Sequence, residues 1–483
     1  MSTQGIPSFL CSLAVIFFLR WLVKLRTRLP LPPGPKGLPI IGNYYLVPKE
    51  HEWLTYARWS QEFGSDLIHL SSFGTHFIIV NSAKAVEELF EKRSAQYSDR
   101  PPLNAMRKIL HINWLLALLP YGERWRSMRR AFHTYFQPSA TPTFHPLLLK
   151  AAHTVLRNLL EQPEDYHQHL RHMANYITLS IGYGLDVKPR NDPYVHIAEK
   201  AMEGLCMGSS SEASLFDAVP FLTKTPSWFF GGQWKQDAEP FARAVDDMVE
   251  EPYKAVQRSV ANNAAKPSVT LSIMNEEGDS AFAKQIPANI YMAGADTTVS
   301  ALAFFMLAMT KYPDAQRAAQ QEIDRVVGND RLPDFSDEGP LPYLDALLKE
   351  TLRWQTVTPL AIQHRVMADD VYNNYFIPGG SIVIPNAWAV LHDPETYPNP
   401  FYFSPERWLQ PSSVSTGTPS STDNFPEIAF GCGRRTCPGR FIARSSMWIT
   451  MASILAAFDI VKDVDEQGRE IDSGEDMTTG MVV

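Results

Sequence analysis

The segment 428–444 holds the densest group of residues that could do chemistry, and it reads IAFGCGRRTCPGRFIAR. Cys437 stands between a glycine-rich loop with two adjacent arginines and the apolar run 441–460, whose spacing predicts a helix. Pro438 suits the first helical turn, so free N–H groups and the nearby Arg435 should lower the pKa of the thiol. Such a thiolate could meet a flat cofactor that approaches the glycine backbone. A glycine-rich turn with one buried cysteine would have the same composition.

The order of residues in this segment resembles the haem-binding loop of the cytochrome P450 family. The matching positions are Phe430, Gly433, Arg435, Cys437 and Gly439. Cys432 does not fit, because no glycine follows it two residues later, and the spacing of the two cysteines is not that of zinc ligands. The resemblance implies that Cys437 is the axial thiolate ligand of a haem iron, as in that family. It also implies that the other four positions belong to the cofactor-binding loop.

A second group of reactive side chains interrupts the long apolar stretch 285–313. Its centre reads AGADTT, with Asp296 and Thr297 on an apolar surface and Gly294 where glycine costs a helix about 1 kcal/mol relative to alanine. A new helix could start here with Asp296 or Thr297 as N-cap, although residues 290–292 continue the apolar pattern without a breaker. The resemblance implies instead the family's oxygen-activation motif. There a distorted turn makes room for dioxygen, Thr297 hydrogen-bonds it and Asp296 relays protons.

Charged and aromatic residues elsewhere also match the family. Trp125 and Arg129 are spaced to share one helical face, which alone would indicate only a surface arginine beside a core tryptophan. The resemblance implies that these two residues bind one haem propionate, for which the arginine fork is suited. By the same resemblance, His364 contacts the second propionate and Arg435 joins it.

Three further charged residues match a structural network. Glu350 and Arg353 are three residues apart on a helix expected to start near Leu344, and Arg407 lies downstream. Such pairs are common and by themselves mean little. The resemblance implies that the three side chains form a buried, fully paired Glu/Arg/Arg network that braces the haem loop.

The N-terminal region has the pattern of a membrane anchor followed by a hinge. Residues 6–23 are almost wholly apolar and are followed by three basic residues, which places the body of the protein in the cytosol by the positive-inside rule. The apolar run is slightly short for a bilayer, so a helix lying in the membrane interface is the alternative. We expect a signal anchor at 1–28, a proline-rich hinge at 29–43 and a haem-thiolate catalytic domain at 44–483. The resemblance to microsomal members implies a single-pass protein of the endoplasmic reticulum membrane.

Composition and strand patterns set the expected fold class. The 483 residues are 45% hydrophobic, enough for one large unit or two ordinary domains, and the net charge of −8 gives no support for nucleic-acid binding. Four cysteines make no disulfide framework, which suits a reducing compartment. Strand patterns at 67–70, 77–80 and 377–384 stand in an otherwise helical chain. We therefore expect a mainly α fold with a small β region, P450-like and preceded by the membrane anchor.

The resemblance covers nearly the whole chain and implies a membrane-bound haem-dependent monooxygenase. Such an enzyme contains haem b, takes electrons from NADPH through a reductase and inserts one atom of O2 into a lipophilic small molecule. The details most resemble fungal microsomal members, many of which tailor terpenoids and other secondary metabolites. The alternatives are a haem-thiolate isomerase or dehydratase that needs no reductase, against which the Asp296–Thr297 pair argues, and a catalytically impaired haem-binding protein. Segments 357–362 and 478–481 should line the substrate pocket, and because the chain ends at Val483 we expect the family's usual closing strand to be missing.

Overall fold

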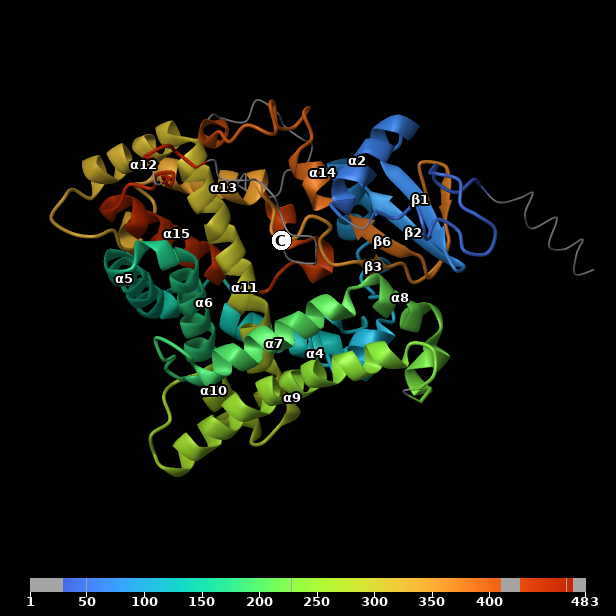
Figure 1. Cartoon of the computed structure of the whole chain (residues 1–483), viewed down its shortest axis with the longest axis horizontal. Coiled ribbons are helices and arrows are strands. Elements are labelled where there is room, and N and C mark those ends of the chain that lie inside the picture. The colour runs from blue at the N-terminus through green and yellow to red at the C-terminus, as the bar shows by residue number, and fades with distance from the viewer. Residues whose placement is uncertain (1–28, 49, 227, 410–425, 466, 472–483) are drawn as a thin grey trace, which may run out of the picture.

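The computed structural model describes residues 29–48, 50–226, 228–409, 426–465 and 467–471. Helices fill most of the molecule, and the strands form two small sheets at one side of it (Figure 1). The expected fold class, mainly helical with a small β region, is therefore confirmed. The segments assigned to a membrane anchor (1–28) and to one wall of the pocket (478–481) lie outside the described residues.

The larger sheet has the strand order β1-β2-β6-β3. The expected hairpin is formed by β1 (Leu67–Ser72) and β2 (Thr75–Val80), joined by Phe73 and Gly74 with φ angles of +46° and +80°, as a tight two-residue turn requires. β6 (Ile382–Pro385) runs parallel to β2 and antiparallel to β3 (His364–Arg365). A separate hairpin consists of β4 (Asp370–Tyr372) and β5 (Tyr375–Ile377). The sheet thereby fixes the position of His364, which lies in β3 two residues after the predicted pocket wall 357–362.

The proline-rich segment lies against these strands. The carbonyl oxygen of Pro30 accepts a hydrogen bond from the Phe376 amide at 2.7 Å, and that of Pro33 accepts one from the His69 amide at 2.8 Å. No helix forms between residues 29 and 43 of the described chain, because repeated prolines remove the amide donors that a helix needs.

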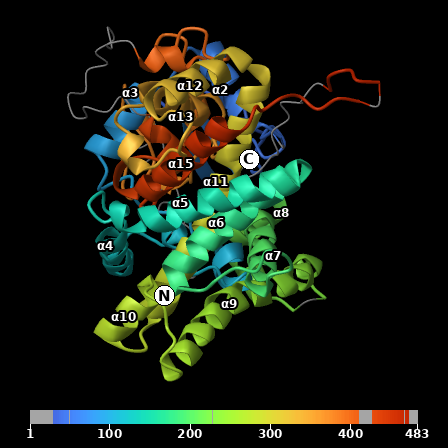
Figure 2. The ribbon, with the colours of Figure 1, turned by 90° about the vertical axis from the view of Figure 1, so that its left-hand side faces the viewer.

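Two sets of helices lie on either side of a central one. The first set is α5 (His145–Glu161), α6 (Tyr166–Tyr183), α12 (Pro313–Val326), α13 (Pro342–Trp354) and α15 (Arg440–Ala457). The second set is α7 (Pro193–Gly208), α8 (Ser211–Ala218), α9 (Gly232–Ala261) and α10 (Val269–Glu277). Helix α4 (Glu123–Phe136) lies lower than the first set, at the level of α7 (Figure 1). Shorter pieces include α2 (Glu52–Phe63), α3 (Ala83–Val86), η1 (Glu87–Lys92), α14 (Ala387–Leu391) and η8 (Pro405–Trp408). From the side, α12, α13 and α15 lie above α6, and α7, α9 and α10 lie below it (Figure 2).

The central helix is α11 (Ala281–Lys311), which passes between the two sets and packs along α6. It is one continuous helix, so the interpretation in which a new helix starts at Asp296 or Thr297 is wrong. Ile286, Leu302 and Phe305 are fully buried, as expected of a helix that is apolar on most faces. Within the described chain it is the one helix long and apolar enough to cross a membrane, and its position in the core accounts for that composition.

Candidate active site

A pocket lies where α4, α7, α11, α13 and α15 meet the loop that precedes α15. Several predicted site residues from distant parts of the chain line it together: Trp125, Arg129, Thr297, His364, Phe430, Arg435 and Cys437. The predicted wall 357–362 contributes Val357, Thr358, Ala361 and Ile362. Asp296, Gly433, Gly439 and the Glu350 network do not line the pocket.

The loop brings Cys437 to the pocket through a backbone hydrogen bond, from the Cys437 amide to the carbonyl oxygen of Phe430 at 2.8 Å. Helix α15 begins at Arg440, so Pro438 lies in the preceding turn, and its expected place in the first helical turn is wrong. Burial raises the pKa of the Cys437 thiol, while the Gly439 amide and the charge of Arg129 act to lower it. The expected lowered pKa is therefore wrong for the thiol in this structure, because the sequence pattern contained the donors but not the burial.

The second loop cysteine, Cys432, also lines the pocket, but in different surroundings. It is packed in the apolar cluster that contains Phe90 and Tyr97. Burial and the nearby Glu91 raise the pKa of Cys432 to about 12. No backbone amide is among the groups that lower its pKa, whereas two amides do so for Cys437, which favours Cys437 as the thiolate.

The loop glycines serve different purposes. Gly433 has φ +59°, and a Cβ there would lie 2.2 Å from the carbonyl oxygen of Phe90, so glycine lets the loop pack against η1. A Cβ on Gly439 would lie 3.9 Å from the Cys437 sulfur, an ordinary contact. Gly431, which the pattern did not single out, has φ +83° and lines the pocket itself.

Three arginines around the pocket lack a carboxylate partner among the described residues. Arg435 donates to the carbonyl oxygens of Ser98 at 2.8 Å and Leu119 at 2.9 Å, and lies 4.4 Å above the Trp125 ring. Arg129 has no hydrogen bond or ion pair within the described chain. Arg100, which sequence analysis missed, is buried and donates to the carbonyl oxygens of Ala117 at 2.7 Å and Ile362 at 2.6 Å. Nothing in its local sequence distinguishes Arg100 from a surface arginine.

Burial is the main cause of the altered acidity of these cations. It lowers the pKa of Arg435 to about 8 and that of Arg100 to about 10. Burying a charge without a partner is costly, so three such cations around one pocket indicate an anionic ligand with more than one negative charge. The two propionates of haem b match that requirement, and Cys437 in the same pocket supplies a metal-binding thiol.

His364 is fixed from two sides. Its Nδ1 donates to the carbonyl oxygen of Tyr97 at 2.6 Å, and its ring meets the Phe90 ring edge-on at 4.7 Å. Burial and the charge of Arg100 hold its pKa well below the usual range, so the imidazole is neutral. The second ring nitrogen therefore carries a lone pair.

Thr297 and Asp296, adjacent on α11, face different surroundings. The Thr297 hydroxyl donates to the carbonyl oxygen of Ala293 at 2.8 Å and lines the pocket. The helix stays α-helical through residues 293–298, so the distorted turn implied by the resemblance is not seen. A Cβ on Gly294 would lie 2.5 Å from Cγ2 of Thr178, and glycine here therefore permits close packing of α11 on α6.

The partner that Asp296 needed is Arg171 on α6, which sequence analysis did not identify. Their charged groups are 4.0 Å apart, and the same guanidinium lies 3.2 Å from Glu199 on α7. Burial raises the pKa of Asp296, and Arg171 opposes that rise. The carboxyl group therefore takes up a proton at a higher pH than an exposed aspartate does, one residue from the pocket-lining Thr297.

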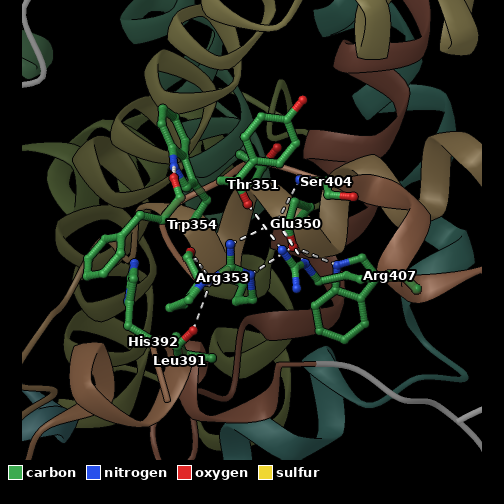
Figure 3. Close-up of polar contacts among 12 residues, drawn as sticks. Glu350, Thr351, Arg353, Trp354, Leu391, His392, Ser404 and Arg407 are labelled. Carbon is green, nitrogen blue, oxygen red and sulfur yellow. Dashed lines mark hydrogen bonds and ion pairs between the residues drawn. The ribbon is translucent and has the colours of Figure 1, made fainter. Parts of the chain in front are cut away.

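Glu350, Arg353 and Arg407 meet in one network (Figure 3). Glu350 receives two hydrogen bonds from Arg353, both at 2.8 Å, and one from Arg407 at 3.1 Å. Arg353 also donates to the carbonyl oxygens of Leu391 and Pro400. The network therefore ties α13 to residues 391–408, and within the described chain none of the hydrogen bonds of these three side chains reaches the cysteine loop.

Comparison of the sequence with those of known proteins identifies a family and several relatives. A family model described as Cytochrome P450 matches residues 32–481. The chain is 41% identical to cytochrome P450 monooxygenase ple1 of Rhodocybe pseudopiperita, over 94% of this chain and 87% of the relative. It is 40% identical to cytochrome P450 monooxygenase 98 of Postia placenta, over 93% and 87%. It is 39% identical to tryptamine 4-monooxygenase of Psilocybe cyanescens, over 94% and 90%.

Proposed function

The chain belongs to the cytochrome P450 family and is a monooxygenase, and from this premise we propose that it holds haem b through Cys437 and oxidises a neutral lipophilic metabolite. The observation that carries the proposal is one pocket containing both the Cys437 thiol and three arginines without carboxylate partners. In this family the haem, when bound, supplies the activation of dioxygen. We propose a secondary metabolite, and within that class a terpenoid, as the substrate.

The protein's own residues bind and orient the cofactor. Cys437 would bind the iron, Arg129 and Trp125 would hold one propionate, and Arg435 would hold the other. His364 would donate to that second propionate only as the imidazolium, because the one N–H of its neutral ring is bonded to the Tyr97 carbonyl oxygen. Arg100, which lies beside His364, adds a third positive charge. Contacts to both propionates and to the Cys437 thiolate would leave the group a single orientation in the pocket that Thr297 also lines.

The proposal is tested by the absorption difference spectrum of the reduced protein with carbon monoxide, followed by NADPH consumption with a fungal reductase. We expect a band typical of thiolate ligation, and NADPH consumption that depends on the reductase. A protein that binds haem but gives an imidazole-type spectrum would contradict the assignment of Cys437.

Arg129→Gln should reduce haem retention, because it removes a cation that has no other hydrogen-bonding role in the described chain. We expect haem transfer to apomyoglobin to become roughly 30-fold faster or more, which corresponds to the lower end of the ~2–5 kcal/mol cost of truncating one member of a buried charged pair. Arg130→Gln is the matched control, since Arg130 is exposed and hydrogen-bonded to Ser127. Equal haem loss from the two variants would show that Arg129 does not hold a propionate.

Thr297→Ala should leave haem content unchanged and increase the hydrogen peroxide released per NADPH consumed. The reason is that Thr297 holds a hydroxyl at the pocket wall, next to Asp296, a carboxyl group whose pKa is raised by burial. Peroxide and NADPH are measured in the same reaction. Thr297→Ser, which keeps the hydroxyl, should release peroxide as the unaltered protein does, and unchanged coupling in Thr297→Ala would refute the proton role.

The remaining partners follow from the family and the sequence. We propose an NADPH-dependent reductase that docks on arginines near the cysteine loop, among them Arg126 and Arg130 on α4. Glu123 lies 3.0 Å from Arg126 and 3.7 Å from Arg130, which reduces the net positive charge of this surface. We also propose attachment to the endoplasmic reticulum membrane through residues 1–28. Strong exposure of the aromatic side chains Phe221 (68%), Trp228 (82%) and Phe230 (66%) supports contact of the body with the membrane interface.

A further inference from the structure

Two histidines face each other on the hairpin of β1 and β2, outside the pocket described above. Nε2 of His69 on β1 and Nδ1 of His76 on β2 are 2.9 Å apart, and the two ring centroids are 5.1 Å apart. Neither side chain lines the pocket, and both are only partly buried, so solvent can reach them. The pair therefore belongs to no part of the proposed catalytic machinery.

The backbone holds the two histidines in place. The strand register pairs His69 with Ile78 and His76 with Ser71, so both histidine side chains leave the same face of the sheet. On its other edge, β1 is held by the proline-rich segment, because the His69 amide donates to the Pro33 carbonyl oxygen at 2.8 Å. A strand fixed on both edges resists the one-residue slip that would turn one histidine to the opposite face. The two rings are thus preorganised as neighbours.

Both imidazoles are mainly neutral near pH 7. Burial, and after it the charge of His76, lowers the pKa of His69 to about 4, and burial also lowers the pKa of His76. Within the described chain no lysine, arginine or carboxylate is among the groups that shift either pKa. Neutral imidazole is the form that binds a metal ion, so protons compete for this pair less than they do for ordinary surface histidines.

The separation of the two facing nitrogens suits two ligands of one metal ion. Imidazole nitrogens that bind a metal ion at ~2.0–2.1 Å and at an angle of roughly 90–110° are roughly 2.8–3.4 Å apart. One hydrogen bond between the rings occupies these nitrogens in the absence of an ion. The other nitrogen of each ring has no hydrogen-bond partner among the residues that the structure describes. Both rings can therefore turn until their lone pairs meet at an ion, which replaces the shared proton.

We propose that His69 and His76 bind one divalent transition-metal ion of the zinc or copper type, with water in the remaining coordination positions. Imidazole suits these ions, whereas Mg²⁺ and Ca²⁺ prefer oxygen ligands. The described residues contain no group of three or more His, Cys, Asp or Glu side chains that could hold a metal ion, so these two nitrogens are the protein ligands. Two ligands in place of four supply about half the binding free energy of a structural zinc site, which corresponds to a Kd of roughly 1–200 µM.

The test is calorimetric titration of the haem-loaded protein with Zn²⁺ near pH 7, with Mg²⁺ as the control ion. We expect zinc to bind in the stated range and magnesium not to bind. His69→Gln and His76→Gln should each weaken zinc binding at least about 10-fold, since even the loss of a group that only supports a ligand costs about 10- to 100-fold. Absence of zinc binding, or equal binding by both variants and the unaltered protein, would overturn the proposal.

His111→Gln is the matched control. His111 is an exposed histidine whose Nδ1 lies 2.8 Å from Asp246, and a histidine beside a carboxylate is a competing zinc site. This variant should bind zinc as the unaltered protein does. Loss of binding in His111→Gln, together with retention in the two hairpin variants, would place the ion on the other pair and refute the assignment.

The pH dependence of zinc binding tests the site in the unaltered protein. Between about pH 7 and about pH 5.5, two histidines with the ordinary pKa of about 6.5 would lose roughly 70-fold in zinc affinity through protonation. Because the pKa of His69 is lowered to about 4 and that of His76 also lies below its ordinary value, we expect a loss of less than about 10-fold. A loss of the larger size would show that zinc binds ordinary surface histidines, which contradicts the proposal.

Discussion

Cys437→Ser should abolish the thiolate-type carbon-monoxide spectrum and reduce reductase-supported oxidation to background. A serine hydroxyl does not ionise near neutral pH and lacks the soft sulfur that the iron of this family takes as its axial ligand. The hydrogen bond from the Cys437 amide to the Phe430 carbonyl oxygen does not depend on the sulfur, and neither do the glycine turns. The loop should therefore keep its conformation. Far-ultraviolet circular dichroism of the variant should therefore match that of the unaltered protein.

Cys432→Ser is the control that shows which of the two loop cysteines ligates the iron. Both cysteines line the pocket, so proximity alone does not select the ligand. The apolar surroundings of Cys432 and the carboxylate of Glu91 oppose its ionisation. We expect the variant to keep the thiolate band, with some loss of stability from the buried hydroxyl. Loss of the band in Cys432→Ser and its retention in Cys437→Ser would reverse the assignment.

The cysteine loop could be predicted from sequence because its chemistry is contiguous. Five defining positions fall within ten residues, and Gly431 and Gly433 supply the positive φ angles of the loop. The Glu350–Arg353 contact could be predicted for a similar reason, since a spacing of three places both side chains on one helical face. Arg407 needed the family resemblance, because it reaches Glu350 only through the tertiary fold.

Residues whose roles depend on long-range packing could not be predicted. Arg100 bonds to carbonyl oxygens more than 260 residues away, and Arg171 meets Asp296 across two packed helices. The prediction of a lowered pKa for the Cys437 thiol was wrong for a related reason. The sequence contained the amide donors and positive charges that lower a thiol pKa, but the burial that raises it is a property of the completed fold.

Arg353→Met should destabilise the protein by roughly 3–5 kcal/mol, because it leaves the Glu350 carboxylate buried without its main partner. Both side chains are fully buried, and Arg353 supplies two of the hydrogen bonds to that carboxylate (Figure 3). The Ser404 amide, the Trp408 indole N–H and the guanidinium of Arg407 remain, but Arg407 is partly exposed and contributes one hydrogen bond to Glu350 at 3.1 Å. We expect a lower urea midpoint for the haem-loaded protein, with haem release at the same urea concentration.

Two comparisons decide whether the cost arises from the buried charge. Arg317→Met on α12 breaks an exposed pair with Asp314 and should cost at most about 1 kcal/mol, as is usual for surface ion pairs. Glu350→Leu combined with Arg353→Met removes both charges and should be more stable than Arg353→Met alone, since the uncompensated carboxylate is gone. If Arg353→Met is no less stable than Arg317→Met, the network does not stabilise α13 against residues 391–408. If the double variant is as unstable as Arg353→Met, the lost hydrogen bonds to Leu391 and Pro400, and not the unpaired charge, account for the destabilisation.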